Sequence, residues 1–192
     1  MVLPAALEPE PHTLGDGTQI VIRPIHPDDA DELQNIFMRL SQESIYLRFL
    51  SFKKELSVEE AIQLATVDYT RRMAFVATML ENGKEIVVGV SRYALLDIAH
   101  PKTAEAAVVV GDEFQGRGIG KILLRRLVMY ARAKGVRHLR GNLQVGNDRM
   151  LYLIQKSGLH HKQRFVDGIW QVNIDIALPK EKHEQLANEH SG

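Results

Sequence analysis

Alternating and continuous apolar segments along the chain predict seven β-strands. The first alternates, with Ile20 and Ile22 on one face, and the later ones carry apolar runs. Two of them flank the Asn82-Gly83 pair, which is typical of a hairpin turn. The predicted strands are residues 18–23, 73–80, 86–96, 106–110, 136–143, 159–166 and 170–178.

Apolar positions spaced three or four residues apart predict helices between these strands. Ser57 and Glu60 have the spacing of a capping box, and Gly135 and Gly158 stand where helices end. The predicted helices cover residues 27–40, 44–49, 57–65, 121–134 and 147–157. The order of elements (strand, helices, three strands, helix, strand, helix, two strands) predicts an α+β fold, an α/β sandwich with a mixed central sheet.

Composition narrows the function classes. The 192 residues suit one domain, with or without tails, and 45% hydrophobic residues suffice for a core. The charge is balanced, 24 basic against 24 acidic residues, so no nucleic-acid or membrane partner is expected. The absence of cysteine excludes disulfides, thiolate metal sites and a cysteine acyl-enzyme. Residues 1–12 lack a basic start and contain three prolines, so we expect no signal peptide and a soluble, cytoplasmic protein.

Residues 104–124 contain a strand, a glycine-rich turn and a helix in direct succession. This arrangement points free backbone N–H groups and the positive end of a helix dipole at an anion. Gly116, Gly118 and Gly120 would let phosphate oxygens approach the amides, because they carry no Cβ atom. The segment therefore predicts a phosphate-binding loop, and the alternative is a glycine-rich turn without a ligand.

Two well-known phosphate loops do not match. A Walker loop needs glycine at the position of Gln115 and Ser or Thr at the position of Ile122. The dinucleotide fingerprint needs a third glycine, which would fall at Lys121 or Leu123. The sequence therefore predicts neither a Walker-type nucleotide site nor a dinucleotide site at this loop.

The pattern Gln115-x-x-Gly118-x-Gly120, after a strand and before a helix, resembles the pyrophosphate loop of the GNAT superfamily of N-acetyltransferases. The resemblance implies acetyl-CoA as the cofactor, with CoA as product. It also implies the GNAT fold over residues 15–178, with a mixed, mostly antiparallel sheet of about seven strands. Residues 1–14 would be a flexible arm and 179–192 a flexible tail. The implied cofactor-binding residues are Val108, Val109, Val110, Gln115, Gly116, Arg117, Gly118, Ile119, Gly120, Lys121 and Asn147.

A closer resemblance is carried by short motifs in the first half of the chain. They are Asp16-Gly17-Thr18, Ile22-Arg23-Pro24-Ile25, Leu40-Ser41, Glu43-Ser44, Tyr46-Leu47-Arg48-Phe49 and Asp68-Tyr69. Their order and spacing are similar to those of bacterial Pat-type protein lysine acetyltransferases. In those proteins the GNAT domain is often fused to a nucleotide-binding or acyl-CoA synthetase-like domain, and this chain resembles the catalytic domain alone. The implied acceptor is a lysine on a protein. Core packing is the alternative reading of Tyr46, Leu47 and Phe49.

A second ligand motif starts at Asn147. In GNAT proteins the equivalent asparagine contacts the CoA arm, and here it could instead be an ordinary helix N-cap. Many of these enzymes carry a tyrosine seven residues later as the acid for the departing thiolate, a position that Ile154 occupies. We expect Tyr152 to lie on a different helix face and not to take that role. The departing thiolate can leave without protonation by a side chain, since a thiol has a pKa of only about 8.5.

Glu105 is the candidate catalytic base. A lysine amine has a pKa of about 10.4 and must lose a proton before it can attack. Glu105 matches the glutamate that Pat-type enzymes use for this step, and its alanine neighbours would desolvate the carboxylate. One alternative is that Glu105 is only a salt-bridged or solvent-facing strand residue. Another is that Asp97 or Asp112 is the base.

The predicted chemistry is direct attack of the amine on the thioester, because the chain has no cysteine and no Ser-His pair at a recognisable elbow. Backbone N–H groups near Val109 and Val110 would polarise the thioester carbonyl. No metal site is expected, because His160 and His161 would point to opposite faces of a strand. Two alternatives to protein lysine acetylation are acetylation of a small-molecule amine and a non-catalytic CoA-binding sensor.

Overall fold

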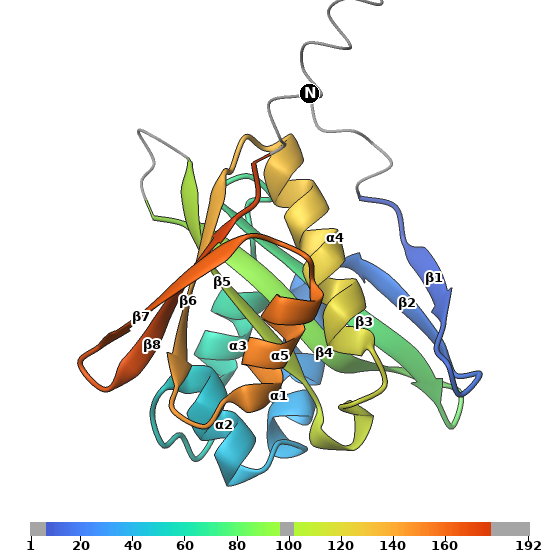
Figure 1. The fold of residues 1–192 in the computed structure, drawn as a ribbon. Helices are drawn as coiled ribbons and strands as arrows, with labels where there is room; N and C mark the ends of the chain where they lie inside the picture. The colour runs from blue at the N-terminus through green and yellow to red at the C-terminus, as the bar shows by residue number, and fades with distance from the viewer. Residues whose placement is uncertain (1–6, 97–101, 178–192) are drawn as a thin grey trace, which may run out of the picture.

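The computed structural model describes residues 7–96 and 102–177, and an eight-stranded mixed sheet lies at its centre (Figure 1). The strand order is β1-β2-β3-β4-β5-β6-β8-β7. Neighbouring strands are antiparallel except β5 and β6, which run parallel. The strands are β1 (Glu10–Thr13), β2 (Gln19–Pro24), β3 (Arg72–Glu81), β4 (Lys84–Leu95), β5 (Thr103–Val110), β6 (His138–Gln144), β7 (His161–Val166) and β8 (Ile169–Asp175). The predicted α+β class with a mixed, mostly antiparallel sheet is confirmed.

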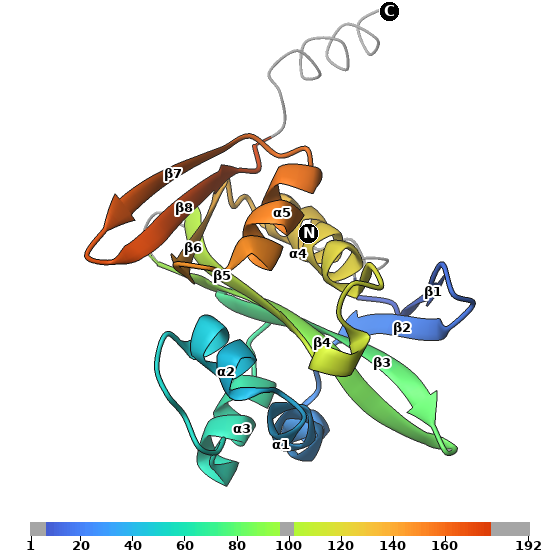
Figure 2. The same ribbon diagram turned by 60° about the horizontal axis from the view of Figure 1, so that its bottom comes forward.

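Helices cover both faces of the sheet. Three of them, α1–α3, lie on one face, and α4 and α5 lie on the other (Figure 2). The helices are α1 (Ala30–Met38), α2 (Gln42–Phe49), α3 (Val58–Ala65), α4 (Ile119–Ala133) and α5 (Asp148–Lys156). Short 3₁₀ turns at Pro27–Asp29 and Asp112–Phe114 precede α1 and α4. No helix in the described part of the chain is long and apolar enough to cross a membrane.

Local sequence signals account for several element ends. The Ser57 hydroxyl accepts a hydrogen bond from the Glu60 N–H (3.2 Å), and the Glu60 carboxylate accepts one from the Ser57 N–H (3.0 Å). This is the predicted capping box at the start of α3. Asn82 and Gly83 both have positive φ and join β3 to β4, as their hairpin signature predicts.

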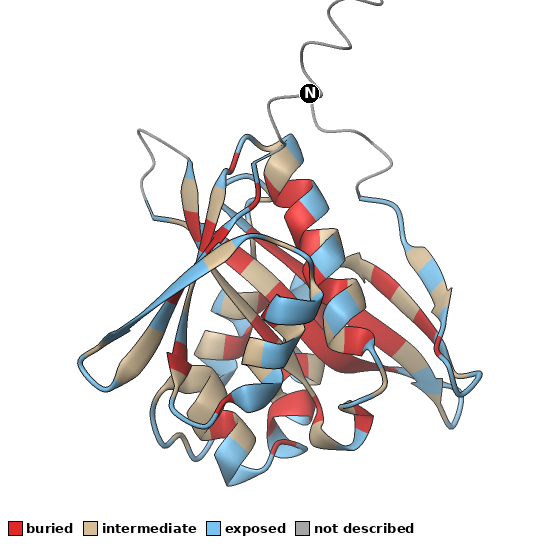
Figure 3. Ribbon diagram, in the orientation of Figure 1, coloured by how far each residue is buried: buried red, intermediate tan, exposed pale blue. Residues whose placement is uncertain are grey.

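The apolar residues form two cores, one on each side of the sheet. The first includes Phe75, Leu123 and Leu127 and lies between the sheet and α4. The second includes Ile36, Phe37 and Val76 and lies under α1–α3. Buried positions follow the middle strands and one side of α4, whereas β7 is mainly exposed (Figure 3). Strand β7 therefore extends beyond both cores, whereas β8 contributes Val172 and Ile174 to the first.

Two differences from the sequence prediction concern element boundaries. Strand β1 lies inside the segment that we expected to be a flexible arm, and it pairs with β2 along its whole length. It tolerates Pro11 because an edge strand needs hydrogen bonds on one side only. Helix α4 begins at Ile119 and not at Lys121, so Gly120 lies within its first turn. The expected C-terminal tail, 179–192, falls outside the described residues.

The parallel pair β5 and β6 separates soon after it forms. Its register partners are only Thr103 with His138, Ala104 with Leu139, and Glu105 with Arg140. Beyond that point β5 continues to Val110 along β4, while β6 continues along β8. The two strands therefore diverge and leave an open seam in the middle of the sheet.

Candidate active site

A cavity of about 620 Å³ occupies the seam between β5 and β6. Its walls come from both diverging strands, from the glycine-rich loop, and from helices on both faces of the sheet: α4 and α5 on one, α2 on the other. The volume lies within the range of small-molecule sites, about 300–1,000 Å³. The cavity thus passes through the sheet where main-chain hydrogen bonding between strands stops.

The cavity brings together most of the predicted cofactor-binding residues. Those that line it are Val108, Val109, Val110, Gln115, Gly116, Gly118, Ile119, Gly120, Lys121 and Asn147. Arg117 is absent from the lining. The predicted set is therefore gathered in one place, with a single side chain directed elsewhere.

The glycine-rich loop has the backbone geometry of an anion cradle. Gly116 and Gly118 have φ of +74° and +91°, a region that residues with a Cβ rarely adopt. Gly118 is the N-cap of α4 and supplies no side chain to the first turn of the helix. The amides at the start of α4 therefore lack a side-chain cap, and the positive end of the helix dipole faces the loop.

The Arg117 side chain anchors the loop from behind. Its Nε donates to the Asp16 carboxylate at 2.8 Å, at the turn before β2. The pKa of Asp16 is lowered to about 2, first by hydrogen bonds from the Thr18 amide and hydroxyl and then by Arg117. The side chain of Arg117 thus points away from the cavity, and only its main chain remains available to a cofactor. The predicted role of Arg117 in cofactor binding is therefore confined to its main chain.

Gln115 also closes the loop. Its side-chain amide donates to the Val110 carbonyl at 3.0 Å and to Asp112 at 2.9 Å, and its oxygen accepts a hydrogen bond from Arg149. Asp112 is held further by the Ser44 hydroxyl at 2.6 Å. Burial alone would raise the pKa of Asp112, but hydrogen bonds from Ser41 and Ser44 outweigh burial and lower it. Asp112 is engaged in the loop and does not line the cavity, which disfavours it as the base.

The β5 edge at the seam offers main-chain donors. Gly111 N–H donates to the Val88 carbonyl on β4 at 3.0 Å. Main-chain groups alternate in direction along an antiparallel ladder, so the amides of Val108 and Val110 point to the seam and that of Val109 points to β4. Of the two predicted carbonyl-polarising donors, Val110 faces the seam and Val109 does not, and the amide of Val108 takes its place.

Glu105 lies at the vertex of the seam. It is the last β5 residue in register with β6, and its neighbours Ala106 and Ala107 line the cavity. Its side chain is exposed, so the expected desolvation by alanine neighbours does not occur. No carboxylate–cation pair within 4.0 Å involves Glu105 in the described part of the chain. The carboxylate is therefore open to an incoming molecule. The alternative base Asp97 lies outside the described residues.

The position of Asn147 agrees with both interpretations of its motif, contact with the CoA arm and capping of a helix. It is the N-cap of α5, its side-chain oxygen accepts a hydrogen bond from the Met150 N–H at 3.2 Å, and it also lines the cavity. Tyr152, expected on another face of the helix, lines the cavity together with Ile154. Its side chain is 61% exposed, so it stands at the rim.

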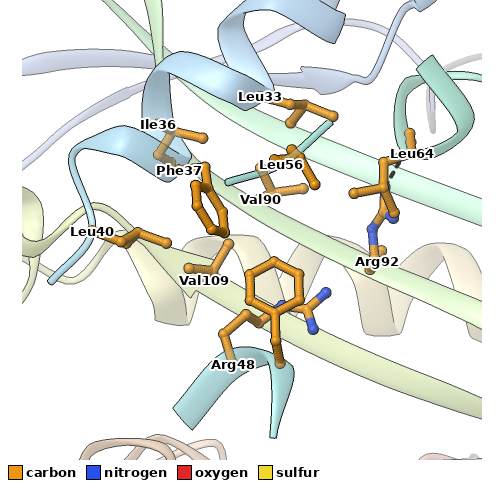
Figure 4. Close-up of a pocket in the computed structure, with 11 residues that line it drawn as sticks. Leu33, Ile36, Phe37, Leu40, Arg48, Leu56, Leu64, Val90, Arg92 and Val109 are labelled. Carbon is orange, nitrogen blue, oxygen red and sulfur yellow. Dashed lines mark hydrogen bonds between the residues drawn. The ribbon is translucent and has the colours of Figure 1, made fainter. Parts of the chain in front are cut away.

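The α2 side of the cavity contains residues that the sequence showed only as a family signature. Leu47 and Arg48 line the cavity from this side. Burial lowers the pKa of Arg48, and attraction to Glu105 opposes this shift. Figure 4 shows Arg48 from α2 and Arg92 from β4 beside a smaller apolar pocket of about 40 Å³. The pKa of Arg92 is lowered to about 10, chiefly by burial and also by repulsion from Arg48.

The described residues contain no cluster of three or more His, Asp or Glu side chains that could hold a metal ion. The charged groups that line the cavity include instead the half-buried Arg48 and the exposed Arg140, Asp148 and Arg149, and the exposed Glu105 stands beside the lining at the vertex of the seam. Such a set can hold an anion and accept a proton.

Comparison with known proteins agrees with this geometry. Residues 37–159 match the model of the acetyltransferase (GNAT) family. The chain is 37% identical over 127 residues to acetyltransferase PA5475 of Pseudomonas aeruginosa, covering 66% of this chain and 67% of that protein. It is 31% identical over 157 residues to acetyltransferase Pat of Mycolicibacterium smegmatis, covering 81% of this chain. The chain spans 46% of that relative, or about half its length.

A solved structure is similar over almost the whole described fold. It is the GNAT domain of S. lividans PAT, with a TM-score of 0.80 and 26% identity. The match covers 91% of this chain and 99% of that one. The family match covers more than half of the chain and includes the glycine-rich loop and Asn147. The chain therefore belongs to the GNAT acetyltransferase family.

Proposed function

We propose that this protein transfers an acetyl group from acetyl-CoA to a lysine side chain of another protein. The observation that carries the proposal is the seam cavity, which has an amide-lined loop on the α4 side, with the exposed carboxylate of Glu105 beside the lining where β5 and β6 separate. Similarity to Pat of M. smegmatis and to the GNAT domain of S. lividans PAT supports a protein acceptor.

The residues fit the proposed cofactor. The uncapped first turn of α4 and the loop at Gly116 and Gly118 offer main-chain donors to a pyrophosphate. The amides of Val108 and Val110 face the seam, where they would hydrogen-bond a thioester carbonyl. Asn147 stands at the far wall beside the same space. Bound acetyl-CoA would supply the activated acetyl thioester.

Glu105 would serve as the base on the other side of the seam. It takes a proton from the lysine ammonium, directly or through a water molecule, because that group has a pKa of about 10.4 and is protonated at neutral pH. The freed nitrogen then forms the new N–C bond while the C–S bond breaks and the thiolate leaves, and the second proton that the nitrogen loses passes to the thiolate, directly or through water, to give the amide and CoA. No protein nucleophile is required, so no acyl-enzyme forms.

The exposure of Glu105 favours a macromolecular acceptor. A lysine on a folded partner reaches a reacting centre only if the centre opens to the surface, and Glu105 and Ala94 beside it are both exposed. A small-amine enzyme would be expected to enclose its acceptor. Small-molecule amine acetylation and CoA sensing without catalysis remain as the alternatives to be tested.

Acetyl-CoA turnover with two acceptor classes tests the proposal. The protein is incubated with acetyl-CoA and either a panel of folded lysine-bearing proteins and lysine peptides or a panel of small polyamines and amino acids. Acetylation is followed by mass spectrometry, and Asp175→Asn serves as a control on the same sheet face. We expect lysine-specific acetylation of proteins or peptides that Glu105→Gln abolishes. Turnover with small amines alone would contradict the proposal, and tight acetyl-CoA binding without turnover would favour the sensor.

A further inference from the structure

An exposed row of residues crosses six strands of the sheet at the level of Glu105. The strands are in register there, so each residue of the row has the next as its partner on the neighbouring strand. Such partners project from the same face of a sheet. The row consists of Arg72, Ala94, Glu105, Arg140, Asn173 and Lys162, and all six are exposed.

This row lies on the face that α1–α3 cover only in part. Helix α1 packs against β4 and helix α2 against β5 and β6, and the three helices leave the β7–β8 hairpin uncovered on that side (Figure 2). The next row on the uncovered part contains Arg164, Gln171 and Asn142, which are also exposed. Solvent-facing polar side chains thus continue from the vertex of the seam to the edge of the sheet.

The charges of this surface are mostly positive and unpaired. Within residues 7–96 and 102–177 no carboxylate lies within ion-pair distance of the four cations Arg72, Arg140, Lys162 and Arg164. Arg117, by contrast, is ion-paired with Asp16. The acids on the surface are Glu105, in its middle, and Asp175, at its far end.

A lysine that reaches Glu105 has these cations on both sides of it along the row. Strands lie about 4.8 Å apart, which places Lys162 about 14 Å and Arg72 about 10 Å from Glu105 across the sheet. Like charges at an interface disfavour association, and complementary charges favour it and speed the encounter. A lysine therefore docks best when carboxylates surround it at about these distances.

We propose that Arg72, Arg140, Lys162 and Arg164 form a docking surface for an acidic patch around the acceptor lysine. The inference rests on the proposed function and names the kind of protein that this site takes. It requires Asp and Glu side chains roughly three or four residues from the target lysine in an extended segment, which rises about 3.3 Å per residue. The same side chains on a folded acceptor would lie about 10–14 Å from the lysine.

Two lysine peptides of equal length test the docking surface. One carries Glu at positions three and four residues on each side of a central lysine, and the other carries Gln at the same positions. We expect the wild type to acetylate the Glu peptide with the higher kcat/KM, by roughly threefold to tenfold at low salt, and to lose the preference at high salt. Lys162→Glu/Arg164→Glu should abolish or invert the ratio between the two peptides.

The control is Arg125→Glu, which reverses one charge, as each substitution of the double variant does, at an exposed position of α4 on the other face of the sheet. It should leave the ratio as in the wild type. Equal kcat/KM for both peptides, or a ratio that the double variant leaves unchanged, would overturn the inference while lysine acetylation itself upholds the proposed function. No acetylation of either peptide or of folded proteins would count against the proposed function. Binding of a labelled 20-mer DNA duplex that the double variant abolishes would reassign the surface to nucleic acid.

Discussion

The two sides of the seam are built from different parts of the chain. The α4 side consists of consecutive residues, with two glycines of positive φ and main-chain amides facing the cavity. The α2 side is assembled from side chains that are far apart in sequence, among them Arg48, Glu105 and Arg140. The first side suits a cofactor that is the same for a whole family, and the second suits an acceptor that differs between members.

This difference separates two kinds of mutational effect. Changes in the loop should act on acetyl-CoA affinity, because its amides serve the pyrophosphate in every cycle. Changes at the vertex and on the exposed row should act on transfer to the acceptor. The predictions below test that separation, beginning with the largest expected effect.

The largest effect is expected from Glu105→Gln. The substitution keeps the size of the side chain and removes its basic oxygens, so transfer at neutral pH should fall about a hundredfold to ten-thousandfold. Glu105 does not line the cavity near the loop, so acetyl-CoA affinity by calorimetry should stay as in the wild type. Asp175→Asn, on the same face, should change neither quantity appreciably. Full turnover in Glu105→Gln would place the base elsewhere.

A second effect is expected from Gly118→Val on acetyl-CoA affinity. Gly118 has φ of +91°, and a Cβ there would have no protein atom within 4 Å, so the side chain would enter the space at the loop. Left-handed backbone strain costs about 1–2 kcal/mol, which alone corresponds to about a tenfold loss when the loop must keep its shape. Calorimetry on the folded variant measures the affinity.

Gly135→Val provides the control for strain. Gly135 follows α4, has φ of +82° and has equally open space, but it lies outside the cavity. It should lower the free energy of unfolding without a change in acetyl-CoA affinity. Equal affinities for the Gly118 and Gly135 variants would rule out the loop as the pyrophosphate site.

A smaller effect is expected from Asn147→Ala. Loss of the N-cap hydrogen bond should lower the free energy of unfolding by about 0.5–2 kcal/mol. Ser57→Ala removes a comparable cap from α3, which is remote from the seam cavity. Both variants should be destabilised in urea, and only Asn147→Ala should also weaken acetyl-CoA binding. The same affinity in both would leave Asn147 with a capping role only.

The smallest effect concerns the tether between the loop and the turn before β2. The pKa of Asp16 is lowered to about 2 in the folded protein from an ordinary value of 3.8. Its contribution to stability is therefore present above about pH 3.8 and is lost as the pH falls toward 2. The difference in free energy of unfolding between wild type and Asp16→Asn should shrink over that interval. A difference that is constant from pH 6 to pH 2 would show that the ion pair with Arg117 does not matter.

Much of the fold was predictable because its signals are local. The hairpin at Asn82-Gly83 and the caps at Ser57 and Asn147 depend on neighbouring residues alone. Strand β1 was missed because its pairing with β2 has no local signature and Pro11 argued against a strand. The loop motif likewise gave the position of the amides, but not that Arg117 turns back to Asp16.

The grouping of residues on the acceptor side could be recognised only from the strand register of the folded protein. Nothing in the sequence places Arg72 on the same row as Glu105, since 32 residues lie between them in the chain and strand β4 lies between them in the sheet. The exposure of Glu105 was also hidden, because its alanine neighbours suggested burial. Tyr152 is exposed and Ile154 is buried, in agreement with their expected places on different faces of α5, but helix geometry alone did not show that both line the cavity.

The most direct test of the account is the pH dependence of transfer by wild type and Glu105→Gln at saturating acetyl-CoA, with one lysine acceptor. If Glu105 removes the proton, the variant should regain activity relative to the wild type as the pH rises toward the amine's own pKa of about 10.4, because a free amine needs no base. A ratio of the two rates that stays constant between pH 7 and pH 10, or a variant as active as the wild type at pH 7, would contradict the account.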